Sequence, residues 1–161
     1  IVNTIVLYQP VASEIRQLIS AYRIVISLER IGDHAVLLVN FLQNIKSLKV
    51  YNELSDLLKT MYKSSEELLR RSLQAFIQQD IESAKWVMKN SSAVVELNQK
   101  MLKKVIEKSR DFDEKKKVIL SFITIKEMVD NIERIADHSK NIAEASIYFL
   151  EGKDIRHVPF F

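Results

Sequence analysis

Two acidic hexapeptides carry the clearest chemistry in this sequence. Glu-Arg-Ile-Ala-Asp-His begins at Glu133, and the same hexapeptide, with glycine in place of alanine, begins at Glu29. In each copy the aspartate, Asp137 or Asp33, follows the glutamate by four residues, which places both carboxylates on one face of a helix. Like charges at this spacing cost a few tenths of a kcal/mol in an isolated helix. Their repetition therefore points to a cation or a basic partner surface that offsets the cost.

Further oxygen donors share the helical face of the second copy. At about 100° per residue, Asp130, Asn141 and Glu144 fall beside its two acids. Carboxylate and amide oxygens are ligands of hard cations. The alternative is a solvated face with ordinary surface ion pairs. The candidate metal ligands are Glu29, Asp33, Asp130, Glu133, Asp137, Asn141 and Glu144.

The histidine that ends each hexapeptide does not match the ferritin-like di-iron pattern. That pattern requires Glu-x-x-His, whereas His34 and His138 come five residues after their glutamates, about 140° around a helix. We therefore expect both histidines to be packing, ligand-supporting or solvent-exposed residues rather than ligands.

The composition excludes several classes of function. The chain has 161 residues, no cysteine and two glycines, so disulfides, thiol catalysis and glycine-rich phosphate loops are excluded. It has no Gly-x-Ser-x-Gly motif and no convincing catalytic triad, and we expect no enzymatic activity. No apolar run reaches the ~18 residues of a membrane span, so we expect no membrane insertion. The net charge of +3 does not by itself indicate nucleic acid binding.

Scarce glycine and proline, with apolar residues at helical spacing, predict an all-α fold of antiparallel helices. Asp80 is the predicted N-cap of the fourth helix, Asp111 and Glu114 form a predicted capping box before the last, and Gly152 ends it. Gly32, inside the second helix, suggests close packing against a neighbour. The predicted helices cover residues 1–8, 11–45, 53–78, 81–109 and 114–150.

The four long helices have apolar stripes that are predicted to face the core, among them the second and the last. In the last helix the stripe includes Ile119, Phe122, Ile125 and Ile132. In the second helix it comprises Ile24, Leu28, Ile31, Ala35, Leu38 and Leu42.

A basic patch surrounds the turn before the last helix. Acidic residues dilute it and Phe112 is its one aromatic, so a solvated bundle end is the default interpretation, and an acidic protein or nucleic acid is the alternative partner. Its members are Lys100, Lys103, Lys104, Lys108, Arg110 and Lys115 to Lys117.

The sequence resembles the PhoU family of phosphate-uptake regulators over nearly its whole length. The resemblance rests on Leu-Tyr-Gln-Pro-Val-Ala at 7–12, on the two hexapeptides with their flanks, and on Tyr-Phe-Leu-Glu-Gly at 148–152. It implies two three-helix bundles in tandem, with a Glu/Asp-x-x-x-Asp signature in each. By position, the acids of the two hexapeptides are the signature acids.

The resemblance also implies a function. PhoU-like proteins are cytoplasmic regulators that act with the ATPase of the phosphate ABC transporter and with its sensor histidine kinase to restrain phosphate uptake and starvation genes. They bind metal through the signature acids, so iron or zinc is implied, with magnesium not excluded, and we expect a homodimer or higher oligomer. The alternative is an archaeal-type transcriptional regulator, which would contact nucleic acid only through a DNA-binding segment preceding this chain.

The chain departs from the family pattern in three places. It starts without methionine and lacks the first helix and most of the second, so we expect an N-terminally truncated member: an incomplete first repeat at 1–47, a second repeat at 50–152 and a tail at 153–161. Leu37 stands where the second copy has Asn141. Relatives place a further Asp-x-x-x-Asp in the fourth helix, where this chain has Asn90, Ser91, Val95 and Glu96. We therefore expect isolated or labile metal ions, at the second copy first, rather than a full multinuclear cluster.

Overall fold

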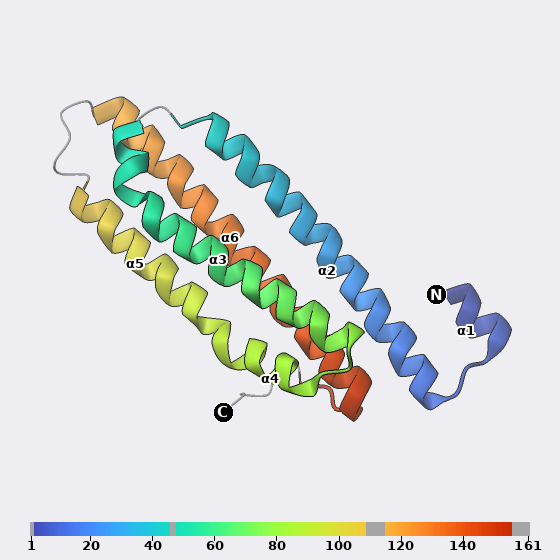
Figure 1. Ribbon diagram of the computed structural model, residues 1–161. Coiled ribbons are helices and arrows are strands. Elements are labelled where there is room, and N and C mark those ends of the chain that lie inside the picture. The colour runs from blue at the N-terminus through green and yellow to red at the C-terminus, as the bar shows by residue number, and fades with distance from the viewer. Residues whose placement is uncertain (1, 46–47, 109–114, 156–161) are drawn as a thin grey trace.

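The computed structural model describes residues 2–45, 48–108 and 115–155, and every regular element in these ranges is a helix (Figure 1). The prediction of an all-α fold is thus confirmed. The helices are α1 (Val2–Tyr8), α2 (Ala12–Gln43), α3 (Leu48–Ile77), α4 (Ile81–Asn90), α5 (Ser92–Lys108) and α6 (Lys115–Glu151).

Two predicted helix ends are confirmed, whereas the third helix begins at Leu48 and not at residue 53 as predicted. Asp80 caps α4 as predicted, because its Oδ1 accepts hydrogen bonds from the backbone N–H of Glu82 (3.0 Å) and of Ser83 (3.2 Å). Gly152 ends α6 as predicted, with φ at 71° and its N–H donating to the carbonyl of Tyr148 (3.0 Å). The predicted capping box of Asp111 and Glu114 lies outside the described residues.

The prediction of one continuous helix over 81–109 is wrong, because the helix is interrupted at Ser91, between α4 and α5 (Figure 1). Two polar side chains bond back to the preceding turn there. Asn90 Nδ2 donates to the carbonyl of Trp86 (2.8 Å), and Ser91 Oγ donates to that of Met88 (3.3 Å). Such side chains offer the backbone an alternative to the regular ladder, which weakens the helix locally.

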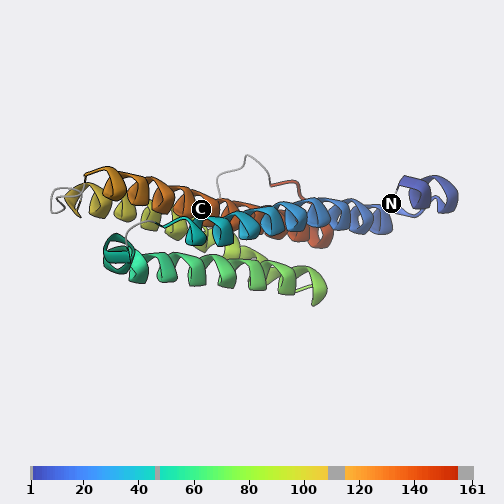
Figure 2. The ribbon, with the colours of Figure 1, turned by 90° about the horizontal axis from the view of Figure 1, so that it is seen from above.

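Helix α6 is the axis of the fold. The long helices α2, α3 and α5 run beside it in an elongated array, and α4 packs against both α3 and α6 (Figures 1 and 2). Because α6 has neighbours on several sides, its buried residues occur all along its length, among them Ile125, Val129, Ile142 and Ala143. From α3, Leu54, Met61 and Leu68 complete the centre of the core.

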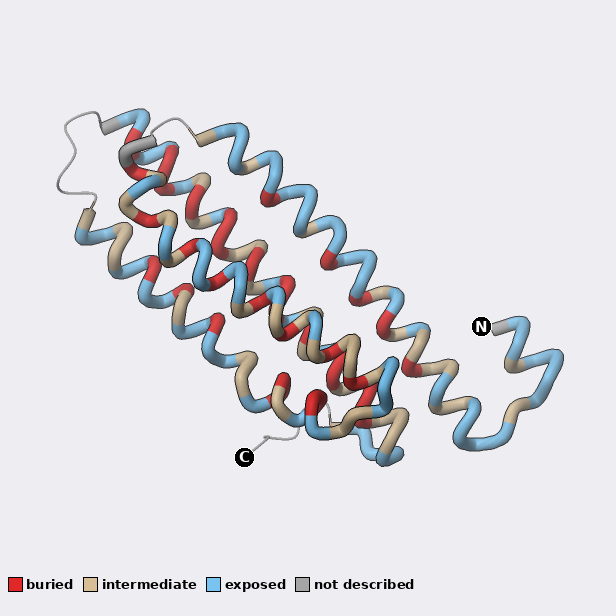
Figure 3. Tube along the Cα trace, viewed as in Figure 1, coloured by how far each residue is buried: buried red, intermediate tan, exposed pale blue. Residues whose placement is uncertain are grey.

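Helix α2 rests on α6 and has no comparable contact with the other described helices. Its buried side chains therefore form a narrow line, seen as isolated red positions in Figure 3. Ile24, Ile31 and Leu38 are only 5%, 8% and 8% exposed and follow a seven-residue spacing, as expected for a seam against a single helix. The broader stripe predicted from the sequence is wrong in part, since Leu28, Ala35 and Leu42 are exposed.

Two further predictions of packing fail for the same reason, namely that a neighbouring helix is missing on that side among the described elements. Gly32 was expected to lie against a neighbour, yet no atom lies within 4 Å of the position a Cβ would take. Ile119, expected in the core, is 55% exposed near the start of α6. Apolar residues on α2 and on the first turns of α6 consequently remain on the surface.

Candidate functional site

The two hexapeptides, far apart in the sequence, meet where α2 crosses α6. The rings of His34 and His138 stack at 5.7 Å between centroids with 22° between their planes. Because α2 and α6 pack along their length, the doubled motif becomes one paired feature of the fold. Both histidines are half-buried packing residues of the α2–α6 interface.

The hydrogen bonds around His34 fix its tautomer. Asn131 Nδ2 donates to the carbonyl of Glu127 (2.8 Å), so its Oδ1 faces His34 Nδ1 at 2.7 Å. An oxygen acceptor there requires a proton on Nδ1. Burial lowers the pKa of His138, and the charges of His34, Arg30 and Arg134 lower it further. His138 therefore favours its neutral imidazole inside the interface.

The seven candidate ligands do not converge on one point. Glu29 and Asp33 are exposed on α2, whereas Asp130 and Glu133 lie half-buried on the side of α6 that faces α5. Asn141 and Glu144 instead line a small hollow of about 270 Å³ with Arg23 and Ile26 of α2. Asp137 lies between these two groups along α6.

Asp130, Glu133 and Asp137 are here named the acidic row, and protein donors lie beside the first two of them. Asn98 of α5 donates from Nδ2 to Glu133 Oε2 and, at 3.4 Å, to Asp130 Oδ1. One helical turn before Asp130, the Lys126 ammonium forms an ion pair with the same Oδ1. The row thus lies beside α5, and the sequence analysis missed both of the residues that contact it, Asn98 and Lys126.

Asn98 could have been recognised from the sequence. It stands four residues after Val94 and three before Met101, both fully buried, so it is a polar residue in a core position of α5. A buried amide requires hydrogen-bond partners, and that requirement predicts polar groups opposite it. Lys126 gave no comparable signal, because a lysine four residues before an aspartate is common on exposed helices.

The electrostatics of the row appear at Asp137. Packing around its carboxyl raises the pKa of Asp137, and the negative charge of Glu133 one turn earlier raises it further, against the opposing effect of Arg134 and Lys140. A carboxylate held in unfavourable surroundings gains when a cation binds nearby. A positive charge bound near Asp137 would therefore stabilise the ionised form of its carboxyl.

The donors around the row suit a hard cation only in part. Asp130, Glu133 and Asp137 offer carboxylate oxygens, and Asn98 Oδ1 is buried with no hydrogen-bond partner among the described residues. Oxygen donors alone favour magnesium, manganese or iron over zinc, which prefers nitrogen and sulfur. Within the described ranges, however, no three His, Asp or Glu side chains are arranged around a common point that could hold an ion.

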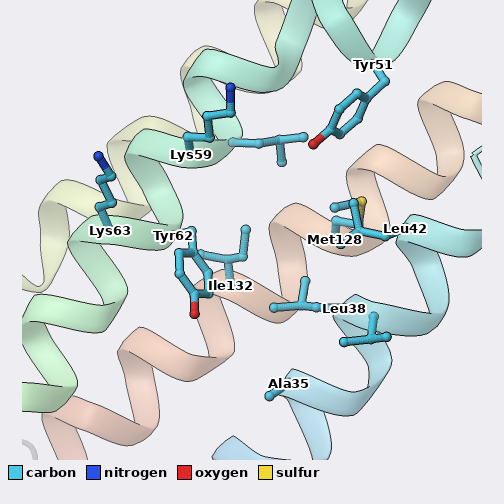
Figure 4. Close-up of a pocket in the computed structure, with 11 residues that line it drawn as sticks. Ala35, Leu38, Leu42, Tyr51, Lys59, Tyr62, Lys63, Met128 and Ile132 are labelled. Carbon is cyan, nitrogen blue, oxygen red and sulfur yellow. The ribbon is translucent and has the colours of Figure 1, made fainter. Parts of the chain in front are cut away.

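Two other surfaces lie away from the row. An apolar groove of about 440 Å³ runs between α2 and α3 over α6; Leu38, Met128 and Ile132 line it, with Lys59 and Lys63 at one edge (Figure 4). The basic patch forms a shallow hollow of α3 and α5, lined by Lys100, Lys103 and Lys104 together with Asp56 and Glu107. Acidic neighbours dilute this patch as expected, and its members Arg110 and Lys115 lie where side chains are not described.

No helix in the described part of the chain is long and apolar enough to cross a bilayer.

Comparisons with known proteins agree with this architecture. A family model described as "PhoU domain" matches residues 1–41 and 58–146. The phosphate-specific transport system accessory protein PhoU homolog of Aquifex aeolicus is 35% identical, over 97% of this chain and 69% of its own length. PhoU homolog 1 of Thermotoga maritima is 26% identical (92% and 63%), and PhoU of Escherichia coli is 28% identical (93% and 61%).

The chain thus spans 61–69% of the length of these relatives. The family match includes both hexapeptides, each on a helix of the α2–α6 pair. With the all-α fold built on that pair, the match identifies the chain as a member of the PhoU family.

Proposed function

We propose that this chain is an accessory regulator of phosphate-specific transport, whose acidic row binds a divalent cation or a basic surface of a partner. The observation that carries the proposal is the placement of the row. Asp130, Glu133 and Asp137 lie on the helix that carries the second hexapeptide, within a fold whose relatives are named accessory proteins of phosphate-specific transport systems.

The regulatory part follows from what such a fold offers. The described helices bring together no catalytic constellation, and a helical array acts through its surfaces, so we infer a non-enzymatic role. Its partners would be the ATPase of the phosphate transporter and the associated sensor kinase, in the cytoplasm, with this chain acting as a homodimer or larger assembly. The DNA-binding alternative depends on a segment preceding this chain and stays a prediction.

The metal part follows from charge and donor type. Three carboxylates along one edge of α6, one of them with a raised pKa, favour a bound cation. Asp130 and Glu133 would supply oxygens from α6, and water would complete the coordination of a hard ion. An ion held there would add positive charge at the α5–α6 interface and so link occupancy of the row to the packing of α5.

Metal analysis of the purified chain tests this proposal. We expect manganese or iron to be retained by the wild type and lost in the variant Glu133→Gln/Asp137→Asn, measured as metal per chain by elemental analysis and by isothermal titration with Mn²⁺. The matched control is Glu29→Gln/Asp33→Asn, which makes the same exchange in the exposed first copy and should lose less. Equal metal content in all three proteins would refute metal binding by the acidic row.

A binding experiment tests the regulatory part separately. The wild-type chain should retain the transporter ATPase in a pull-down with purified components, and the row variant should retain less of it if the row contacts a basic surface. Failure of the wild type to bind either the ATPase or the sensor kinase would refute the proposed partners, whatever the metal content.

A further inference from the structure

Three surface hollows follow one another along α3, on the side that faces α4 and α5 (Figure 1). Their volumes are about 590, 430 and 420 Å³. The first and second share Thr60 and the second and third share Trp86, so the hollows adjoin. Together they are here named the α3 channel. At 1.5 Å per residue, its length along α3 from Asp56 to Arg71 is ~22 Å.

Five lysines line the α3 channel without an ion pair to any described residue. Lys63 lies on α3, Lys89 lies on α4, and Lys100, Lys103 and Lys104 lie on α5. The three lysines of α5 are three or four residues apart or adjacent, so their ammonium groups share one side of that helix. Like charges at this spacing repel one another, and a bound carboxylate relieves the repulsion.

Two carboxylates of the channel are already paired within the chain. Glu67 accepts hydrogen bonds from Arg70 and Arg71, which lower its pKa to about 2. Glu82 forms an ion pair with Lys85 at 3.0 Å. These two acids are therefore engaged before any contact with the five lysines.

The other acids of the channel leave an excess of positive charge. Asp80 accepts hydrogen bonds from the first turn of α4, and Asp56 lies 3.8 Å from Lys59. Glu107 lines the same hollow as the lysines of α5 and offsets one of their charges. The channel thus carries more ammonium groups than free carboxylates, in a chain whose total net charge is only +3.

The channel suits an acidic protein segment better than a nucleic acid. Single-stranded nucleic acids are held by a continuous positive groove and by exposed aromatic faces on which bases stack. Trp86 is the only tryptophan of the chain, and the guanidinium of Arg71 covers one face of its ring at 4.2 Å from the centroid. Glu107 and Asp56 interrupt the row of lysines and would repel phosphates there.

We propose that the α3 channel binds an acidic segment of a partner protein in extended conformation. In an extended chain, alternate side chains point the same way about 6.6 Å apart, close to the ~5–6 Å between lysines three or four residues apart on a helix. Alternate carboxylates can therefore each meet one lysine. A channel of ~22 Å holds about seven such residues. This surface is separate from the acidic row, opposite to it in charge, and adds to the proposed function.

Isothermal titration of the purified chain with a twelve-residue peptide, in which glutamate and serine alternate, tests the proposal. We expect binding at low ionic strength that weakens steeply as the salt concentration rises to about 0.15 M, because exposed charges are screened. The same peptide with glutamine in place of every glutamate should not bind. Failure of the glutamate peptide to bind the wild type at low salt would overturn the proposal.

Removing the lysines of α5 should weaken this binding. The variant Lys100→Gln/Lys103→Gln/Lys104→Gln is expected to raise the dissociation constant about tenfold, since each exposed ion pair contributes a factor of about two to three.

The matched control for this variant removes three charges elsewhere. Lys116→Gln/Lys140→Gln/Lys153→Gln lowers the net charge equally at residues that do not line the channel. It should raise the dissociation constant less than about threefold, because screened charges outside the channel act only at long range.

Trp86 reports directly on the channel, because no other tryptophan contributes to the emission. Its fluorescence should change with the same midpoint as the titration. Thr60→Tyr places a bulky neutral side chain where the first and second hollows meet and should weaken binding at unchanged net charge. The control is Thr124→Tyr on α6, because both threonine hydroxyls donate to the carbonyl four residues earlier, at 2.8 Å for Thr60 and 3.0 Å for Thr124. Circular dichroism checks that each variant is folded, and the lysine variants carry the test if Thr60→Tyr is not.

The outcomes separate the channel, the class of partner and the proposed function. Equal weakening by the two triple lysine variants, or binding without a change in Trp86 emission, would overturn the channel as the binding site. Tighter binding of a six-nucleotide single-stranded oligothymidylate than of the glutamate peptide would overturn the acidic protein partner in favour of nucleic acid. None of these measurements depends on the metal content of the acidic row, so the two proposals fail independently.

Discussion

The attachment of α2 to α6 provides the sharpest test of the architecture. The α2 seam consists of Ile24, Ile31 and Leu38, all less than 9% exposed, and α2 has no other extensive contact among the described helices. Ile31→Ala removes buried methyl groups at the centre of this seam, which costs 2–5 kcal/mol in typical cores. Because the seam is narrow and its neighbours can close over the lost volume, we expect Ile31→Ala to lower the free energy of unfolding by about 2–3 kcal/mol.

A second substitution should add to the first. Ile24 and Ile31 are separated by two helical turns, about 10 Å, so their effects should be additive to within about 0.5 kcal/mol. Ile24→Ala/Ile31→Ala is then expected to cost about 4–6 kcal/mol. The control is Leu28→Ala on the same helix, since Leu28 is 37% exposed and its loss should cost less than about 1 kcal/mol.

Hydrogen exchange followed by mass spectrometry distinguishes local from global loss. Once undocked, α2 is not stable by itself, because isolated helices in water are marginal. With 1.4 kcal/mol per factor of ten, α2 amides in Ile31→Ala should exchange about 30- to 150-fold faster, while amides of α3 and α6 keep their protection. Uniform acceleration across all helices would refute the idea that α2 is a separately anchored element. Unchanged exchange in α2 would show that the seam carries no stability.

Three further predictions concern single residues. Gly32→Ala should stabilise the chain by about 0.5–1 kcal/mol, since a Cβ there meets nothing within 4 Å, whereas Gly152→Ala should destabilise it by about 1 kcal/mol because φ is +71°; opposite shifts in melting temperature check both. Asp80→Ala should lower the free energy of unfolding in urea by about 1 kcal/mol. Hydrogen bonds lower the pKa of Asp80 below 3.8. The contribution of Asp80 is therefore present above pH 3.8 and is lost as pH falls through the folded pKa. The folded pKa of His138 lies below 6.5 through burial and the charge of His34, so stability is lost as pH falls below 6.5; an imidazole NMR titration midpoint at or above 6.5 would contradict this.

Local sequence signals predicted the course of the chain well where one helix end or one capping residue decides it. Asp80 and Gly152 act as predicted because an N-cap carboxylate and a left-handed glycine act within a single turn. The break at Ser91 escaped prediction, since apolar spacing continues through it from Val87 to Val94. Periodicity reports which face is buried and is insensitive to one interrupted turn.

The candidate site was predictable only as far as one helix extends. A helical wheel placed Asp130, Glu133, Asp137, Asn141 and Glu144 on one face of α6, and they do share one helix. A helical wheel contains no information on neighbouring helices. It therefore could not predict that one part of this face lies beside Asn98 of α5 and another part beside Arg23 of α2. That these residues, together with Glu29 and Asp33 of the first copy, bind metal remains a prediction, and these two acids are exposed on α2.

By itself, the sequence determined an all-α chain, the helix ends at Asp80 and Gly152, and a doubled acidic motif in the pattern of one family. These properties depend on residues within a few turns of one another, where backbone geometry and side-chain type are sufficient. Only the tertiary structure decided that His34 stacks on His138, that Asn98 meets the acidic row, and that α2 buries a narrow seam. Most of these contacts join helices far apart in the sequence. Their geometry depends on how whole helices pack, and no local pattern records it.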